Sequence, residues 1–557
     1  MLSKHLLRTN FLAGITVGIV ALPLSMALAI ASGVAPQYGL YTAIVGGIVI
    51  ALTGGSRINI SGPTAAFVVI LLPITQTYGL GGLLIAGLMA GVILLLMGLM
   101  RLGNLIELVP YPVTVGFTAG IAVVIGTFQI PNLLGLHLEH PGVHYLDRLQ
   151  AIMHALPGLQ WDELFISVIT LAALILWPRL KTRVPSYLVA LVLGTGLAWL
   201  CGLLFDGFDV ATIGSSFHYS LDGLTGDGIP PVPLHFVWPW ELPDASGQPI
   251  GLSLHLIYAL IGAAFAIAML GAIESLLCAV VSDGMTGHAT DPNRELIGQG
   301  IGNIIVPFFG GIPATAAIAR TVTNIGAGGS SPLASVVHAL FILVAIVLIA
   351  PLLAYIPMAS MGAILLIVAR NMSEAKHFLH ILKVAPRNDI LVLLTCFGLT
   401  VLLDMEIAVG AGMALAAMLF IKRMIELTEV QLVGSNRERE YPETPADVAI
   451  YNINGPMFFG AAQQALKNIL NFRKEVRIVI LDMSDVPMMD MTGIVALTSI
   501  INSLQKKRVM LVINGLRPQI MGMLRKSGVT PKDGEIAFAH NIHESLKVAE
   551  GTGPQST

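Results

Sequence analysis

Two short stretches decide how this chain folds: GGSRINISGPTAA at residues 54–66 and GGIPATAA at residues 310–317. Each begins with a pair of glycines and passes through a proline and a threonine to a pair of alanines. Both lie among apolar residues, where glycine and proline interrupt a helix that would otherwise continue. The two matched interruptions predict an architecture that is repeated within one chain.

The composition around these stretches excludes a soluble globular protein. Of the 557 residues, 55% are hydrophobic and only 11% are charged, with a mean hydropathy of +0.81. An average soluble domain carries about 25% charged residues. The charges are about twice as dense in residues 431–557 as in the rest. We therefore expect one large membrane domain followed by one soluble domain.

Apolar runs predict fourteen membrane segments, several of them shorter than the roughly 20 residues that a full crossing needs. They lie near residues 11–31, 38–53, 63–77, 80–100, 112–130, 164–177, 186–204, 253–280, 297–309, 313–325, 332–350, 356–369, 389–403 and 406–421.

The distribution of Lys and Arg tests this count, because cytoplasmic connections of membrane proteins carry an excess of both. With a cytoplasmic N-terminus, the outer connections receive only Arg148, and the long connection 205–252 has no Lys or Arg. The inner connections receive Lys4, Arg8, Arg57, Arg101, Arg179, Lys181, Arg183, Arg294, Arg370, Lys376, Lys383, Arg387, Lys422 and Arg423. The soluble tail is therefore predicted to be cytoplasmic.

Fourteen segments divide into seven and seven, and an odd repeat places the second copy upside down in the bilayer. Inverted repeats are typical of secondary transporters, which hold substrate near the midplane between interrupted helices. We expect the repeats at about residues 1–204 and 253–425, with each interruption in the third segment of its half. Helices that start at Pro63 and Pro313 would expose unpaired N–H groups and attract an anion. The alternative is chance similarity, because glycine and proline are common in membrane helices.

Two ionisable side chains, Glu274 and Arg320, lie well within predicted spans. Burying a charge there costs at least about 2.5–3.5 kcal/mol, so each is a candidate site residue. Arg320 would hold an anion, and Glu274 would bind a proton or Na⁺, with a structural salt bridge between them as the alternative. The charges at Asp283, Arg294 and Glu295 are expected to be solvated, and His338 to be a packed neutral histidine.

No pattern of catalytic or metal-binding residues accompanies these charges. We find no metal-ligand cluster, no nucleophile with a base and no phosphate loop, so we expect neither an enzyme nor a cofactor. The glycine-rich run 298–302 lies within a predicted span, and close helix packing explains it better than ligand binding does. Cys201, Cys278 and Cys396 lie in apolar runs and imply no disulfide framework. The net charge of −3 indicates no nucleic-acid partner.

The tail has the pattern of a small α/β domain with a partly parallel sheet. Strands are predicted at 446–455, 477–482, 509–513 and 535–539, and helices at 460–471, after Gly493 and at 516–527. Asp482 and Asp490 are expected to cap the ends of a strand and a helix rather than to form a catalytic pair. We expect a membrane domain over 1–425, a linker over 426–444, the tail domain over 445–549 and disorder over 550–557.

The stretch PQYGLYTA at residues 36–43, continuing to GGSR at 54–57, resembles the signature of the SulP anion transporters, the bacterial relatives of solute carrier family 26. The tail resembles a STAS domain through residues 482–484 and 490–493. Within the family, residues 62–66, 274–281 and 295–305 are similar to those of the DauA-type C4-dicarboxylate transporters.

This resemblance implies a uracil-permease-like fold of seven plus seven inverted helices with a cytoplasmic STAS domain, in the bacterial inner membrane and usually as a homodimer. A core of segments 1–4 and 8–11 would move against a gate of segments 5–7 and 12–14. The implied substrate-binding residues are Thr64, Ala65, Ala66, Ala317, Ile318, Ala319 and Arg320, with the helix of segment 10 starting near Ile318 and not at Pro313.

Two departures from the family pattern bear on coupling and regulation. Sodium-coupled bicarbonate members have Asp at the position of Glu274 and Thr at the position of Cys278, and a thiol is a poor ligand for a hard cation. Proton coupling through Glu274 is therefore preferred over Na⁺. Thr492 stands where the related anti-sigma-factor antagonists have a phosphorylatable serine, which makes it a candidate regulatory phosphosite.

The resulting hypothesis is a proton-coupled secondary transporter that takes up C4-dicarboxylates such as succinate, fumarate and aspartate by alternating access. Sulfate or bicarbonate transport within the same family is the first alternative. The second is a membrane-anchored anion sensor that signals through its STAS domain. Expected partners are the anionic substrate, membrane lipid, a second copy of the chain and a cytosolic protein that docks on the STAS domain.

Overall fold

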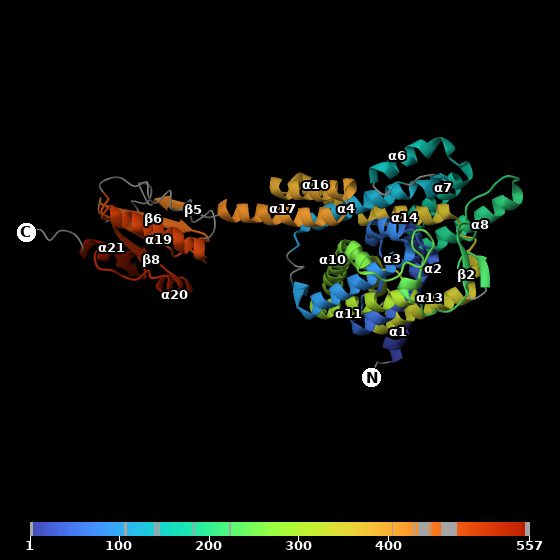
Figure 1. Cartoon of the computed structure of the whole chain (residues 1–557), viewed down its shortest axis with the longest axis horizontal. Helices are drawn as coiled ribbons and strands as arrows, with labels where there is room; N and C mark the ends of the chain where they lie inside the picture. Colours follow the sequence, from blue (N-terminus) through green and yellow to red (C-terminus); the bar gives the residue numbers. More distant parts are fainter. Residues whose placement is uncertain are drawn as a thin grey trace, which may run out of the picture. The chain divides into compact units, whose positions relative to one another are not determined.

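The computed structural model describes residues 4–104, 109–138, 142, 145–180, 182, 184–221, 224–403, 405–426, 429–432, 445, 447–457 and 476–551. Two compact units make up the chain, residues 1–414 and residues 415–557 (Figure 1). The first unit contains the helical membrane domain, and the second contains a five-stranded sheet with its helices.

The first half of the membrane domain contains the long apolar helices expected from the sequence. They are α1 (Lys4–Ala31), α2 (Pro36–Thr53), α3 (Ala65–Leu99), α4 (Tyr111–Phe128), α7 (Trp161–Leu176) and α8 (Ser186–Leu204), with the short α5 (Ile130–Leu134) and α6 (Tyr145–Ala155) between them. Helix α3 is kinked at Gly79, whose φ of 68° is accessible to glycine. The predicted third and fourth segments are thus the two parts of α3.

The second half follows a connection that contains α9 (Ile213–Ser216), β2 (His218–Leu221) and β3 (Leu224–Asp227). Its helices are α10 (Leu254–Thr286), α11 (Pro292–Ile305), α12 (Ile318–Gly326), α13 (Pro332–Leu353), α14 (Met358–Met372), α15 (Ala375–Val384), α16 (Arg387–Leu402) and α17 (Met405–Glu426). Within the described residues, eight helical spans are long and apolar enough to cross a membrane. They contain α1, α2, α3, α4, α7, α8, α10 and α13, and the span of α4 continues through α5. The remaining predicted segments correspond to α11, α12, α14, α16 and α17.

The helices form two groups (Figure 1). Helix α3 packs most extensively on α11 and α10, and α1 packs on α13, which produces one group. In the other group, α4 packs on α16, and α14 packs on both α7 and α4. These groups correspond to the core and the gate implied by the family resemblance.

Close packing of glycines holds α11 against its neighbours, as the sequence predicts for the run 298–302. A Cβ atom at Gly298 would lie 2.4 Å from Gly54 Cα, and one at Gly300 would lie 2.5 Å from the backbone nitrogen of Leu95. These backbones are therefore too close for any side chain at the two positions.

The second unit contains a sheet with the strand order β5-β6-β7-β8-β9. Its strands are β5 (Glu429–Leu432), β6 (Val448–Asn454), β7 (Ile478–Asp482), β8 (Met510–Asn514) and β9 (Ile536–Ala539). Only β5 is antiparallel to its neighbour. It lies within the segment 426–444 that we expected to be a linker, so the sheet begins earlier than that boundary.

Helices cover both faces of this sheet. Helices α19 (Met491–Lys506) and α20 (Pro518–Lys526) share one apolar cluster with the strands, and α21 (Ile542–Gly551) shares the other. Successive strand residues alternate between the clusters, as in Val479 and Ile480, because neighbouring side chains of a strand point to opposite faces. The helix predicted at 460–471 lies outside the described residues.

The glycine contact between α11 and the end of α2 gives a direct test of the packing. Gly298→Ala is expected to lower the stability of the membrane domain by about 1–3 kcal/mol, because the new methyl group has no space. The measurement is Tm of the purified protein in detergent.

Gly284→Ala in α10 is the matched control, since a Cβ there meets no atom within 4 Å. It is expected to leave Tm unchanged or to raise it slightly, because alanine favours a helix by about 0.5–1 kcal/mol over glycine. Equal Tm values for the two variants would contradict the close approach of these backbones.

Candidate functional site

The two interrupted segments meet through a pair of two-residue strands. Strand β1 (Ser61–Gly62) pairs antiparallel with β4 (Thr315–Ala316), in the register Ser61↔Ala316 and Gly62↔Thr315. The backbone N–H of Ala317 also donates to Ile60 O, at 2.9 Å. Helices α3 and α12 begin immediately after these strands, so their N-termini start from one shared structure.

The expectation that Pro63 and Pro313 occupy the first helical position is wrong. Helix α3 begins at Ala65, and α12 begins at Ile318, which confirms the start implied by the family resemblance. Pro63 instead precedes α3 and Pro313 precedes β4. At both positions the chain is extended and needs no N–H donor. Neither cap residue, Thr64 or Ala317, makes a side-chain cap hydrogen bond. The first amides of both helices are therefore left for an anion.

The predicted substrate-binding residues occupy these two helix starts. Ala65 and Ala66 are buried and Thr64 is half-buried, whereas Ile318 and Ala319 are exposed. The alanine side chains leave the backbone amides of the first turns uncovered by bulky groups. The structure thus supplies backbone donors on both sides and few side-chain atoms to discriminate between anions.

Glu274 connects α10 to the start of α3. Thr64 Oγ1 donates a hydrogen bond of 2.7 Å to Glu274 Oε2, and Glu274 itself is half-buried. The next residue of α10, Ser275, contacts β4. Its Oγ lies within hydrogen-bond distance of Thr315 Oγ1, at 2.7 Å. The Glu274 carboxyl therefore lies next to the N-cap residue of α3.

Arg320 lies on the other side of the same junction and is 2% exposed. Its Nη2 donates to Ser25 Oγ at 3.2 Å and to Pro63 O at 3.1 Å, while Nη1 has no hydrogen-bond partner. The structure shows no ion pair between Arg320 and Glu274, both of which are described, so the salt-bridge alternative is wrong. A Cβ at Gly62 would lie 2.4 Å from Arg320 Nη1, which explains the glycine before Pro63.

Glu295 is buried in the structure, so the expectation that its charge is solvated is wrong. It is 1% exposed, and its Oε2 accepts hydrogen bonds of 2.9 Å from the backbone N–H groups of Gly55 and Ser56. Its Oε1 accepts from Gln299 Nε2 at 3.1 Å. The carboxylate thus fixes the loop that leads into β1. The only sequence signal was Gln299 at the helical spacing i, i+4.

Asn303 performs the matching role in the second repeat. Its Nδ2 donates to Ala314 O and its Oδ1 accepts from Ala314 N, both at 2.8 Å. The side chain therefore pairs with the segment before β4 as a neighbouring strand would. Neither Asn303 nor Glu295 was identified as functional from the sequence, because no local pattern shows that Glu295 bonds to backbone in the other repeat or that Asn303 bonds to the segment before β4.

Two other predicted membrane residues are buried. His338 is 0% exposed, and neither ring nitrogen has a hydrogen-bond partner, in agreement with a packed position. Cys278 Sγ donates to Thr321 Oγ1 at 3.3 Å, so this thiol joins α10 to α12.

Glu163 was not expected to be functional. It is 2% exposed, and it accepts a hydrogen bond from Ala211 N. It thereby holds the beginning of the connection that contains α9 and the β2–β3 hairpin.

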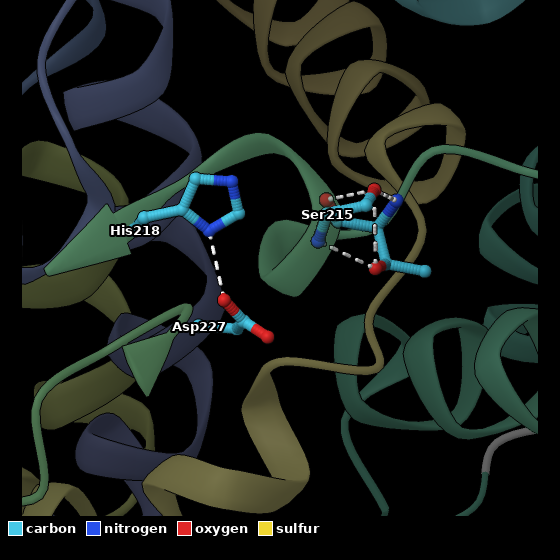
Figure 2. Close-up of polar contacts among 4 residues, drawn as sticks. Ser215, His218 and Asp227 are labelled. Carbon is cyan, nitrogen blue, oxygen red and sulfur yellow. Dashed lines mark hydrogen bonds and ion pairs between the residues drawn. The ribbon is translucent and has the colours of Figure 1, made fainter. Parts of the chain in front are cut away.

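A serine, a histidine and an aspartate in that connection do not form a catalytic triad (Figure 2). His218 Nδ1 pairs with Asp227 Oδ1 at 2.9 Å. Ser215 Oγ instead accepts from Thr212 N at 2.8 Å and donates to Thr212 O at 3.1 Å, in the capping box of α9. No hydrogen bond joins Ser215 to His218, so the histidine cannot activate this hydroxyl.

In the soluble unit, the predicted capping roles are confirmed. Asp490 Oδ1 accepts from Gly493 N at 2.8 Å at the start of α19, and Asp482 Oδ1 accepts from Ser484 N at 3.1 Å after β7. Thr492 is the second residue of α19 and is half-buried.

The fold and the junction of two half-helices define the class of an anion transporter, here followed by a separate α/β domain. The chain matches the model of the sulfate permease family over residues 7–395 and that of the STAS domain over residues 441–549. It therefore belongs to the sulfate permease family.

Two relatives and one solved structure are similar to this chain over almost its whole length. The putative sulfate transporter YvdB of Bacillus subtilis is 41% identical over 530 residues, which cover 95% of each chain. The bicarbonate transporter BicA of Picosynechococcus is 30% identical over 93% of this chain and 90% of its own. The structure of the murine Slc26a9 anion transporter in the inward-facing state has a TM-score of 0.82 at 18% identity, covering 98% of this chain and 92% of that one.

These relatives support transport rather than catalysis. Their names refer to sulfate, bicarbonate and anions, so the likeness to DauA-type C4-dicarboxylate transporters stays a prediction.

Removal of the Asn303 side chain tests its role as a substitute strand. Asn303→Ala leaves the N–H and the C=O of Ala314 without partners, and each buried unpaired group costs about 1–3 kcal/mol. We expect a clear fall in Tm of the purified protein together with loss of transport.

Asn132→Ala is the control, because among the described residues the Nδ2 of Asn132 bonds only to the side chain of Gln129, at 3.1 Å. This variant is expected to change Tm little. An unchanged Tm in Asn303→Ala would show that the segment before β4 is held by other contacts.

Proposed function

We propose that this protein is a proton-coupled secondary transporter that takes up C4-dicarboxylates, such as succinate, fumarate and aspartate, by alternating access. The observation that carries the proposal is the hydrogen bond between Thr64 and Glu274. It places a group that can take up a proton beside a helix start that attracts an anion, with Arg320 Nη1 unpartnered at the same junction.

Charge explains how proton and substrate would move together. An ionised Glu274 repels an anion at the start of α3, and protonation removes this repulsion. The loaded site then contains a neutral carboxyl, the anion and the Arg320 guanidinium. The unloaded site contains Glu274 and Arg320 as opposite charges. Both states avoid a large uncompensated charge in the membrane, where such charges are costly.

The core group of helices would carry this site past the gate group. In the proposal the protein lies in the bacterial inner membrane, with its N-terminus and STAS domain in the cytoplasm, and works as a homodimer. The STAS domain would dock a cytosolic protein, with Thr492 as a regulatory phosphosite.

The second candidate function is transport of sulfate or bicarbonate. The names of YvdB and BicA favour it, and so does the composition of the site, because backbone amides bind any small anion. In this candidate the fold and site stay the same, and only the substrate and the coupling ion differ.

Radiolabelled uptake into proteoliposomes distinguishes these candidates. Succinate, sulfate and bicarbonate are compared with and without an inward proton gradient, first in the absence of Na⁺ and then with Na⁺ added. We expect succinate to accumulate only when the gradient is present. Gradient-independent uptake of sulfate, or bicarbonate uptake that requires added Na⁺, would overturn the proposed substrate and coupling.

Glu274→Gln tests the proton-coupling residue. The amide keeps the size of the side chain but cannot exchange a proton, so gradient-driven accumulation of the substrate is expected to disappear. Exchange of internal for external substrate should persist in part, because it needs no net proton movement. The readouts are accumulation and counterflow in the same proteoliposomes.

Glu241→Gln is the matched control, since Glu241 is an exposed residue of the connection between the repeats. It should behave as the unmodified protein in both assays. Retained gradient-driven accumulation in Glu274→Gln would exclude Glu274 as the coupling residue.

A further inference from the structure

The family signature at residues 36–43 forms part of a second pocket that the proposed function does not use. The β2–β3 hairpin, the following connection and the segment after α11 close over the beginning of α2. We call this cavity of about 160 Å³ the hairpin pocket, and the lining residues that matter here are Gln37, Tyr41, His218, Ser220, His235 and Phe309. None of them belongs to the site at the starts of α3 and α12.

Two buried polar atoms of this pocket have no hydrogen-bond partner. Gln37 is 6% exposed and Tyr41 is 2% exposed, yet neither Gln37 Oε1 nor the Tyr41 hydroxyl is bonded. Buried polar groups are nearly always satisfied, so each orphan needs an explanation. The amide oxygen requires a donor, and the phenol offers one. A ligand that both donates and accepts would satisfy the pair.

The rest of the polar lining that the structure describes contains no fixed charge. His218, Tyr219, Ser220 and His235 contribute imidazole and hydroxyl groups, and no Lys, Arg, Asp or Glu is among the described lining residues. Asp227 binds His218 Nδ1 at 2.9 Å, which fixes the orientation of this ring at the rim (Figure 2). A cavity of this volume is many times larger than the roughly 10–15 Å³ that a single water needs. The described part of the lining therefore fits a small polar molecule of low charge.

We propose that the hairpin pocket binds a monoprotonated oxyanion, either a hydrogen dicarboxylate or bicarbonate. The acid O–H would donate to Gln37 Oε1, and an oxygen of the same group would accept from the Tyr41 hydroxyl. Such a site collects the anion together with its proton. The inference rests on the proposed function, since it specifies which ionic form of the substrate is collected.

The pocket is connected to the transport site through the backbone. A Cβ at Gly310 would lie 3.4 Å from the ring of Tyr38, and Gly310 begins the stretch that leads through β4 to α12. Thr42, the neighbour of Tyr41, donates from Oγ1 to Ile312 O at 3.0 Å. A ligand against Tyr41 therefore lies beside the segment that positions Arg320.

Fluorescence of the purified full chain measures binding in this pocket. Trp238 and Trp240 stack with ring centroids 4.9 Å apart and contact Phe308, the neighbour of the lining residue Phe309. Sodium hydrogen succinate is titrated at a mildly acidic pH that keeps it singly protonated, and sodium bicarbonate is titrated at neutral pH. Sodium sulfate is the unprotonated comparison at both pH values. All titrations are performed in an Ile318→Glu background, because a carboxylate at this exposed helix start repels anions from the transport site.

Both protonated probes are expected to bind in this background, and sulfate is expected to bind at least about tenfold more weakly. Tyr41→Phe should weaken binding of hydrogen succinate by about tenfold, the loss typical of a hydrogen bond to a charged ligand. Tyr258→Phe, which removes a hydroxyl from an 82% exposed side chain, is the matched control and should change nothing. Equal binding of sulfate, or unaltered binding in Tyr41→Phe, would overturn the proposal.

Two further measurements keep the result interpretable. Ser220→Ala removes a rim hydroxyl from an exposed residue and should weaken hydrogen succinate binding about threefold, which replaces the Tyr41 test if that variant does not elute as folded protein. Uptake by the unmodified protein is recorded in parallel. Transport by that protein without binding in the Ile318→Glu background would refute the pocket alone, whereas binding without transport would refute the proposed function.

Discussion

The antiparallel pairing of β1 with β4 is the interaction on which the rest of the membrane domain depends. A helix that is interrupted at membrane depth leaves backbone N–H and C=O groups that no water can satisfy, so they must find partners within the protein. Each interruption here supplies the partner for the other, through Ser61↔Ala316 and Gly62↔Thr315. Glu295 and Asn303 satisfy the backbone that precedes the two strands. Neither half of the repeat can therefore form its site alone.

This constraint also determines the chemistry of the site. Backbone strands that pair in the middle of a helical domain need small residues around them, such as Gly62 beneath the Arg320 guanidinium and Gly298 against Gly54. Small residues leave helix amides as the main anion ligands, and amides do not distinguish one oxyanion from another. In the proposed mechanism, discrimination and energy coupling then depend on the few ionisable groups at the junction. Glu274 and Arg320 are held by different partners, Thr64 in one case and Ser25 with Pro63 O in the other.

The sequence predicted the membrane segments, the inverted repeat and most of the sheet of the second unit, because hydropathy, charge bias and strand patterns are local signals. It also singled out the two charged residues that lie at the junction. It missed features that exist only in three dimensions. The prolines indicated where the helices break but not that paired strands would follow, since β1 and β4 are separated by about 250 residues. Glu295 follows Asp291 and Arg294 closely in the sequence and so has the local pattern of a solvated loop. Its burial depends on Gly55 and Ser56, which lie in the other repeat.

In the proposal, the helix that contains the signature at residues 36–43 serves two sites. Along α2, Tyr41 faces the hairpin pocket, Thr42 bonds to the backbone at Ile312, and Ala43 lies against Gly62. Consecutive residues of a helix point about 100° apart, so three neighbours reach three different structures. A transport site built from unselective amides gains a filter if the preceding pocket accepts only the protonated form of its anion. The same few residues then connect that filter to the segment that carries Arg320.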